Sequence, residues 1–236
     1  MIVLGIDTTS PYCSVAIVKD GVVLTDKILN NGNTHSEVLL PLIKSSLEET
    51  GLKASDIDLF ALSSCPGSFT GVRIGASTIK GLAFGSGKHC VGVSTLEALA
   101  YNLKGVNGIV VPVMDARRNQ FYNAIFRCRD NKVERLTGDR LISSSALEEE
   151  LSLYQEKIYF VGDGYALAVN SVKNENICPT DEEYIAQRGS SVCELAEKTY
   201  NLSKNKEMFS DLVLKPGYLR ASQAERERNE KRQKNI

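Results

Sequence analysis

The sequence predicts an α/β protein made of two similar lobes, each a mixed sheet flanked by helices, and three observations support this. Apolar runs of strand length alternate with amphipathic stretches of helix length along most of the 236 residues. An apolar run that ends on an aspartate, a short polar turn and a return strand occur together near residues 2–18 and again near 109–126. The loop 104–108 lies between them. Because such a recurrence is typical of an internal duplication, we predict two lobes and a charged, flexible tail, with these bounds: 1–104, 105–220 and 221–236.

The first lobe should begin with three strands. Residues 2–6 form a nearly continuous apolar run, which predicts a buried strand. Strands 12–18 and 22–29 follow, and Asp20–Gly21 between them is a hairpin turn signal. The lobe therefore opens on an antiparallel unit.

A helix is predicted from residue 34 or 36 to about residue 49, closed by a glycine. The stripe Leu39, Ile43 and Leu47 is enough to bury one face of this helix on a sheet. Val38 and Leu42 widen the apolar arc. The helix is therefore covered either by a broad core alone or by its own sheet and a second surface.

The most informative stretch is 63–85, where a strand at 57–62 leads through a turn into a helix that contains glycines. Ser68 is placed to cap this helix. Gly71 and Gly75 lie one turn apart on the same face, and each interior glycine costs about 0.5–1 kcal/mol relative to alanine. Close approach of another group would offset this cost. That group can be a phosphate, the chain's own sheet, or a second helix of this chain or of a partner, and the pattern favours packing over phosphate.

The second lobe repeats the opening unit with a strand at 109–114 that closes on Asp115 and an alternating return strand at 120–126. The turn Gly162–Asp163–Gly164 either faces a nucleoside or is a plain loop. The other predicted strands and helices of the chain follow from the same patterns: strands at 90–93, 132–136 and 157–161, and helices at 94–103, 145–153 and 189–200.

Composition excludes several classes of protein. A net charge of −1 gives the chain as a whole no attraction to nucleic acid or to an anionic membrane. The six cysteines contain no Cys-x-x-Cys pair, so neither a zinc knuckle nor a redox pair is indicated. There is no signal-peptide pattern and no apolar run of membrane-spanning length. We therefore expect a cytoplasmic protein with reduced thiols and no membrane partner.

The opening pattern of strand, aspartate, hydroxyl-rich turn and antiparallel strand resembles the actin/Hsp70/sugar-kinase (ASKHA) fold. In that fold the turn contacts phosphate and the aspartate helps to hold a metal. The resemblance assigns these roles to Asp7, Thr8 and Thr9. The alternative is that these side chains satisfy only the hydrogen bonds of their own turn.

Five stretches carry a closer resemblance over nearly the whole chain: IDTTSPYCSVAI, CPGSFTGVRIGASTIKGLAFG, VGVSTLEALA, MDARRNQFYNAIF and YLRASQAERE. Together they are similar to the TsaB (YeaZ) family. Its members are dimerisation subunits of the bacterial complex that makes threonylcarbamoyladenosine at adenosine 37 of tRNA. The resemblance implies the ASKHA fold and a place in that complex.

The resemblance also implies that the chain has no catalytic residues. The catalytic paralogue TsaD holds its metal with a His-x-x-x-His pair just after a Val-Gly-Val-like strand. The two histidine positions fall on Thr95 and Leu99 of this sequence. Neither side chain can replace an imidazole as a metal ligand, so we expect no metal site.

In the family, the two helices that match 35–50 and 68–85 pack against the same helices of TsaD, which would explain both the wide apolar arc and the glycines. We therefore expect a heterodimer with a TsaD-like paralogue, and a homodimer through the same surface is the alternative. A TsaE-like ATPase is a further expected partner, and tRNA is expected to bind only through the complex. The expected interface residues are His35, Val38, Leu42, Phe69, Gly71, Val72, Gly75 and Thr78.

No tightly bound cofactor is expected, and binding of ATP or ADP should be weak. The alternative function is a metal-dependent peptidase-like or nucleotide-hydrolysing ASKHA enzyme. The only two histidines, His35 and His89, have no metal-binding neighbour in sequence, which argues against it. Four arginines either contact tRNA directly or are scattered surface residues, and the nearly neutral net charge favours the second interpretation: Arg117, Arg118, Arg127 and Arg129.

Overall fold

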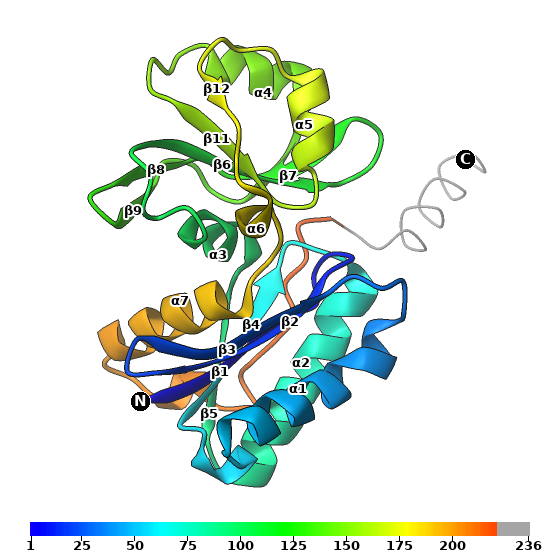
Figure 1. Cartoon of the computed structure of the whole chain (residues 1–236), viewed down its shortest axis with the longest axis vertical. Coiled ribbons are helices and arrows are strands. Elements are labelled where there is room, and N and C mark those ends of the chain that lie inside the picture. Colours follow the sequence, from blue (N-terminus) through cyan, green and yellow to red (C-terminus); the bar gives the residue numbers. More distant parts are fainter. Residues whose placement is uncertain (221–236) are drawn as a thin grey trace, which may run out of the picture.

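A five-stranded sheet forms the first lobe of the computed structural model, which describes residues 1–220 (Figure 1). Its order is β3-β2-β1-β4-β5, with β1 antiparallel to β2 and parallel to β4. The three predicted opening strands and their hairpin are confirmed. The strands are β1 (Ile2–Asp7), β2 (Cys13–Lys19), β3 (Val22–Leu29), β4 (Leu59–Cys65) and β5 (His89–Ser94).

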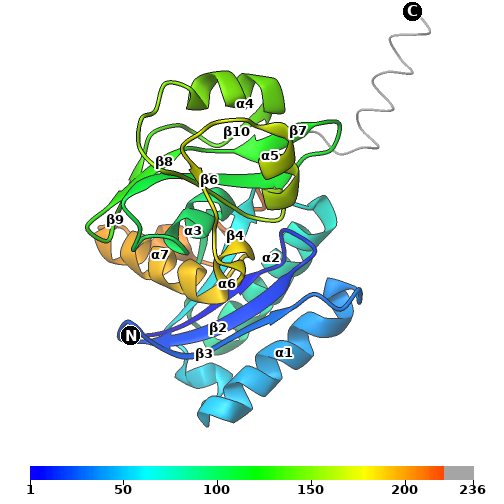
Figure 2. The same ribbon diagram turned by 45° about the horizontal axis from the view of Figure 1, so that its top comes forward.

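Helices cover both faces of this sheet. Helices α1 (His35–Thr50) and α2 (Phe69–Ser86) lie side by side on one face, and α7 (Gly189–Leu202) lies on the other (Figures 1 and 2). Alternate residues of the strands are buried under each layer, so the lobe has one apolar cluster on either side of the sheet. Two short 3₁₀ turns, η1 (Ala54–Asp56) and η2 (Glu207–Phe209), complete the lobe.

Capping residues define where the two long helices of the first lobe begin and where α1 ends. The Ser68 hydroxyl accepts a hydrogen bond from the amide of Gly71 at 3.3 Å, so it caps α2 as expected. At the start of α1, the Thr34 amide donates to the Glu37 carboxylate at 3.0 Å. Helix α1 ends at Gly51, which has a left-handed conformation with φ of 67°.

The second lobe is built on a seven-stranded sheet whose main path runs β10-β7-β6-β11-β12. Helix α3 (Thr95–Tyr101) lies between the two lobes (Figure 1). The strands are β6 (Gly108–Asp115), β7 (Gln120–Asn123), β8 (Phe126–Arg129), β9 (Lys132–Arg135), β10 (Arg140–Ser143), β11 (Ile158–Val161) and β12 (Ile177–Cys178). The helices are α4 (Ser144–Leu151), α5 (Tyr165–Ser171) and α6 (Glu182–Ile185).

The two sheets share one strand order, which confirms the predicted duplication. When β6, β7, β10, β11 and β12 are matched in turn to β1, β2, β3, β4 and β5, both sheets have the same path. The β8–β9 hairpin pairs with β6 outside this path and has no counterpart in the first lobe. The predicted fold class, α/β with two duplicated lobes of mixed sheets flanked by helices, is therefore confirmed.

One predicted strand is divided in two. The alternating run 120–126 forms β7 and then β8, and both pair antiparallel with β6 in the same register. The break at Ala124–Ile125 lies opposite Val111 and Pro112, and a proline has no amide hydrogen to donate across the ladder. The side-chain amide of Asn123 donates to the Pro112 carbonyl at 3.0 Å instead.

The chain returns to the first lobe after the second, so the predicted domain boundary is wrong for its last part. Helix α7 packs on the first sheet because two glycines permit it: a Cβ on Gly5 would lie 2.7 Å from the carbonyl oxygen of Gly189. Residues 189–220 therefore belong with the first lobe rather than with 105–188. The predicted tail, 221–236, lies outside the described residues.

Residues 210–220 form a strap that follows the first lobe and reaches the second (Figure 1). Leu214 is buried in the core beneath α2, and the amide of Gly217 donates to the Ser64 carbonyl at 3.1 Å. The Arg220 guanidinium then donates to the Ala116 carbonyl of the second lobe at 3.3 Å. The strap therefore ties the two lobes together beside the cleft that separates them.

Neither disulfides nor a membrane span occur in the described part of the chain. All six cysteines lie there and are unpaired. No helix within residues 1–220 combines the length and the apolar character needed to cross a bilayer.

Candidate functional site

The glycines of α2 face the interior of this chain rather than a partner. A Cβ on Gly71 would overlap the carbonyl oxygen of Thr8, and a Cβ on Gly75 would lie 2.5 Å from the Thr8 hydroxyl. That hydroxyl donates to the Gly71 carbonyl at 2.8 Å. The expectation that these glycines smooth an outer face is therefore wrong: they let α2 sit directly on the turn after β1.

The other expected interface residues are also partly or wholly inside the lobe. Leu42 and Val72 are buried in the core. His35 is half-buried, with Nε2 2.8 Å from the carbonyl oxygen of Ser10. Phe69 is half-buried and stacks on Tyr218, with their ring centroids 4.4 Å apart. Val38 and Thr78 are half-buried as well. These residues therefore pack partly or wholly inside the first lobe and do not form an exposed face.

The outer surface of α1 and α2 carries apolar residues that sequence reasoning missed. Leu40 on α1 is 56% exposed and Phe84 on α2 is 77% exposed. Gly81 and Gly85 are exposed too, and a Cβ on either would meet nothing within 4 Å. We call Leu40, Gly81, Phe84 and Gly85 the outer helical face. The available signal was that Gly81 and Gly85 are also spaced by one turn of α2.

The predicted phosphate turn uses most of its polar groups for its own structure. Asp7, Thr8 and Thr9 are all buried. Asp7 Oδ1 accepts from the Thr9 amide at 2.8 Å and from the Thr9 hydroxyl at 2.7 Å, and the Thr8 hydroxyl is bonded to α2. Only Asp7 Oδ2 has no partner among the described residues. A phosphate would therefore meet a buried carboxylate and few free donors.

A cleft of about 740 Å³ lies between the lobes, at the carboxyl ends of β1 and β6. Asp163 lines this cleft, so the turn 162–164 borders it. This is the position that a turn facing a nucleoside would need. Its walls come from both lobes and from the strap. The main lining residues are Thr9, Ser10, Tyr12, His35, Ser68, Phe69, Asp115, Arg117, Tyr122, Asp163, Tyr218 and Arg220.

A buried glutamine joins the two lobes beside this cleft. Gln187 is 1% exposed; its Nε2 donates to Asp163 at 3.1 Å and its Oε1 accepts from the Ser10 hydroxyl at 2.8 Å. Burial raises the pKa of the Asp163 carboxyl to about 6, the hydrogen bond from Gln187 opposes this, and the charges of Asp7 and Asp115 add to it. The interior of the cleft is therefore acidic.

Stability should rise as the pH falls through the Asp163 transition. The folded chain binds this proton at about pH 6, whereas the unfolded chain binds it near the ordinary value of 3.8. Lowering the pH from about 7 to about 5 should therefore contribute about 1 kcal/mol to the free energy of unfolding. Urea unfolding of the natural protein and of Asp163→Asn at both pH values isolates this contribution. Equal pH dependence in the two proteins would contradict the assignment.

The two positions that match the metal-binding histidines of TsaD lie in the core. Thr95 and Leu99 on α3 are 0% and 1% exposed, and Leu99 packs in an apolar cluster with Phe126 and Met114. These side chains do not fit a metal ion. Within residues 1–220, no group of three or more His, Cys, Asp or Glu side chains could hold one either.

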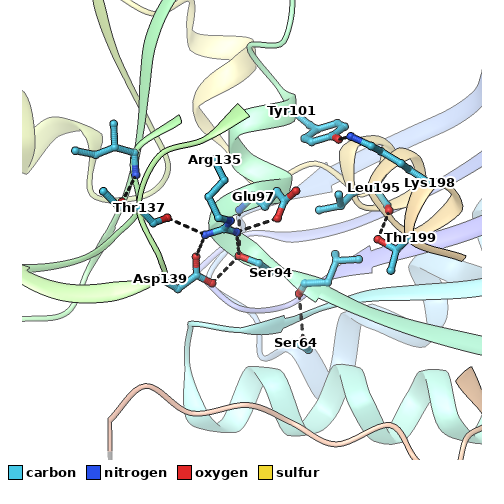
Figure 3. A network of polar contacts seen from close by, with 12 residues as sticks. Ser64, Ser94, Glu97, Tyr101, Arg135, Thr137, Asp139, Leu195, Lys198 and Thr199 are labelled. Atoms are coloured by element: carbon cyan, nitrogen blue, oxygen red, sulfur yellow. Dashed lines mark hydrogen bonds and ion pairs between the residues drawn. The ribbon is translucent and has the colours of Figure 1, made fainter. Parts of the chain in front are cut away.

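The surface beside these positions is occupied by a network around Arg135 (Figure 3). Its guanidinium donates to Asp139 at 2.5 Å and to Glu97 at 2.9 Å, while the Ser94 hydroxyl donates to Asp139 at 2.6 Å. Ser94 also caps α3 by accepting from the Glu97 amide. The network therefore ties the β8–β9 side of the second lobe to the start of α3.

The four arginines considered for RNA contact do not form one patch. Arg117 lines the cleft, and Arg118 follows it in the same exposed turn. Arg127 pairs with Glu134 and Glu156 on the β8–β9 side. Arg129 pairs with Asp130 in the β8–β9 turn. Only the first two are therefore placed to act at the cleft.

Comparison with known proteins gives consistent matches. Residues 28–232 match the family model described as "TsaD: tRNA N6-adenosine threonylcarbamoyltransferase". The Bacillus subtilis "tRNA threonylcarbamoyladenosine biosynthesis protein TsaB" is 29% identical over 228 residues, covering 95% of this chain and 96% of that protein. The Haemophilus influenzae protein of the same description is 31% identical over 226 residues and covers 92% of each chain.

Solved structures show the same fold. A Pseudomonas aeruginosa protein described as similar to peptidase YeaZ superposes with a TM-score of 0.78 at 22% identity, covering 93% of this chain and 99% of that chain. YeaZ from Pseudomonas aeruginosa gives a TM-score of 0.74 at 22% identity, covering 89% and 97%. At this identity the likeness concerns the fold alone.

Proposed function

Given that the chain belongs to the family of the TsaD model and, within it, to the TsaB (YeaZ) proteins of tRNA threonylcarbamoyladenosine biosynthesis, we propose that it is a non-catalytic dimerisation subunit. In this role it binds and activates a TsaD-like catalytic paralogue. The reaction itself, transfer of a threonylcarbamoyl group to tRNA, takes place on the paralogue. The single observation that carries the proposal is the pair Thr95 and Leu99, buried where the paralogue needs two imidazoles.

The absence of metal-binding side chains at these positions supports a non-catalytic role. Leu99 is in contact distance of Gly162, so the core fills the space on this side of α3. The hydroxyl of Thr95 is buried without a partner among the described residues, and it cannot act as a substitute for an imidazole. The peptidase-like alternative finds no ligand set in residues 1–220 and is not favoured.

The outer helical face supports docking of a helical partner. Phe84 offers a large apolar side chain, and Gly81 and Gly85 beside it allow another helix to approach the α2 backbone. Apolar area buried in such a contact contributes about 25 cal/mol per Å². Val38 and Leu42 belong to the apolar core cluster under the two helices, so they help to hold the helices in place.

Other partners belong to this proposal as well. A TsaE-like ATPase would join the complex, and tRNA would bind through the assembled subunits. In the absence of the paralogue, the same outer helical face would form a homodimer. Binding of ATP or ADP is expected to be weak, because the Thr8 and Thr9 hydroxyls already donate within this chain.

The proposal is tested by mixing the purified chain with the TsaD-like paralogue of the same organism. Light scattering should show a one-to-one complex, even where the chain alone is a homodimer, and tRNA modification should depend on the paralogue and increase when this chain is added. Metal analysis of the chain alone serves as the control and should find no stoichiometric ion. Modification of tRNA by this chain alone, or failure to form the complex, would overturn the proposal.

A further inference from the structure

We infer that a second pocket, beside the β2–β3 hairpin, binds a free amino acid with an apolar side chain. This goes beyond the scaffold role, because it gives the chain a small-molecule ligand. The pocket lies where α3, α6 and α7 meet the hairpin (Figure 2). It shares no lining residue with the cleft at the carboxyl ends of β1 and β6. We call it the hairpin pocket.

The size and the apolar walls of the hairpin pocket suit a small amphipathic ligand. Its volume of about 380 Å³ is at the lower end of the range for small-ligand sites. Val18 and Val23 are directly paired across the hairpin, so their side chains lie on the same face and form one wall. The rings of Tyr101 and Tyr184 line the pocket from α3 and α6. An apolar side chain can therefore be buried against the hairpin.

Charged groups of both signs line the hairpin pocket in equal number. The two acids and two bases are Glu194, Glu197, Lys104 and Arg188. The next layer keeps this balance, because Asp26 pairs with Arg188 while Lys198 donates to the Tyr101 hydroxyl. A lining that is neutral as a whole but carries separate charges favours a zwitterion over a simple anion or cation. The ammonium and carboxylate of an amino acid meet this requirement.

Glu197 is the acid that is free to bind the ammonium group. Glu194 and Glu197 are three residues apart and share one face of α7. The Lys104 ammonium lies 2.6 Å from the Glu194 carboxylate, so this pair balances itself. Glu197 is half-buried and forms no ion pair within residues 1–220, and the nearby ammonium of Met1 pairs with Asp20 instead. A ligand ammonium would therefore supply the missing partner of Glu197.

Arg188 is placed to bind the carboxylate group. Its Nε donates to Asp26 at 2.9 Å and its Nη1 lies 3.5 Å from the Glu183 carbonyl oxygen, which leaves Nη2 without a partner among the described residues. The Asp26 side chain is 6% exposed, so it holds the guanidinium from a fixed position. An arginine fixed in this way loses little entropy when it binds a carboxylate.

The hairpin pocket also lies where the chain crosses twice between the lobes. Asn102 joins the two crossings: its Nδ2 donates to the carbonyls of Tyr184 and Ala186 at 2.8 Å each, and its Oδ1 accepts from the Ser191 hydroxyl at 2.7 Å. A ligand held between Tyr184 and α7 would contact both lobes at this junction. Binding should therefore raise the melting temperature of the chain.

Isothermal titration of the full chain with L-leucine tests the inference, and one molecule should bind per chain. N-acetyl-leucine lacks the ammonium and leucinamide lacks the carboxylate, so each should bind about tenfold more weakly or worse, because each loses a charged hydrogen bond. Glu197→Gln should weaken binding of L-leucine about tenfold for the same reason. Glu149→Gln is the matched control, since it makes the same change at an exposed glutamate of α4 outside the pocket.

A second variant fills the hairpin pocket without removing a charge. Val23 is 51% exposed on β3, and tryptophan is a good strand former, so Val23→Trp should fold and should abolish binding. Thermal melting checks the fold of each variant.

Three results would overturn the inference: no binding of L-leucine, equal losses in Glu197→Gln and Glu149→Gln, or full binding by Val23→Trp. Leucinamide that binds as tightly as L-leucine would indicate recognition of a peptide N-terminus and would also overturn it. Since the paralogue takes no part in the assay, none of these results bears on the proposed dimerisation.

Discussion

Replacing Gly71 with alanine is expected to lower the free energy of unfolding by about 3 kcal/mol or more. The added Cβ would overlap the Thr8 carbonyl oxygen, which is backbone and cannot rotate away as a side chain could. Moving α2 outward would also break the hydrogen bond from the Thr8 hydroxyl to the Gly71 carbonyl. Urea unfolding of the purified variant measures the loss.

Gly81→Ala is the matched control for this prediction, since it makes the same change in the same helix. A Cβ there meets nothing within 4 Å, and alanine is the better helix former, so a gain of about 0.5–1 kcal/mol is expected. A Gly71→Ala protein as stable as the natural one would mean that α2 does not rest on the turn after β1. The same reasoning predicts that Gly75→Leu also lowers the free energy of unfolding, because its side chain would meet the Thr8 hydroxyl.

This pair of glycines shows how far the sequence alone could lead. The spacing of Gly71 and Gly75 correctly predicted that something approaches α2 closely. It could not show that this neighbour is Thr8, which is 63 residues earlier in the chain than Gly71. Helical periodicity defines which residues share a face, but only the tertiary packing determines whether that face points inward or outward.

Local elements were predictable because their signals are local. The strands of the opening unit, the cap at Ser68 and the recurrence of the unit follow from periodicity, capping and turn chemistry over a few residues each. The division of the strand at 120–126 was not visible there, since its cause, Pro112, lies on the neighbouring strand. Such a break can be predicted only when it is known which residues of the two strands face each other.

The cleft was beyond sequence reasoning for a similar reason. Its walls combine the turn after β1, the start of α2, the turn after β6 and the strap, and position along the chain placed the strap in the wrong lobe. Gln187 and Ser10, which join the lobes there, are 177 residues apart. The acidic residues Asp115 and Asp163 and the stacked pair Phe69 and Tyr218 line one cleft only because folding brings these segments together.

Replacing Phe84 with aspartate is expected to weaken binding of the TsaD-like paralogue about 100-fold or more. A hot-spot residue near the centre of an interface contributes about 2 kcal/mol or more, and a carboxylate in place of Phe84 would be buried without a partner. Because Phe84 is 77% exposed in the isolated chain, the variant should fold normally. Isothermal titration of the paralogue with each protein measures the change in affinity.

The control for this variant is Leu202→Asp, which places the same charge on an equally exposed apolar position. Leu202 is 75% exposed but lies on α7, across the sheet from the outer helical face, so binding should not change (Figure 1). Phe84→Leu keeps apolar area and should retain most of the affinity. If Leu202→Asp abolished the complex while Phe84→Asp preserved it, the partner would dock on the α7 side. The two substitutions test opposite faces of the first sheet. Helix α7 meets this sheet through the Gly5–Gly189 contact, and its exposed residues point away from α1 and α2. One substitution therefore cannot disturb both surfaces.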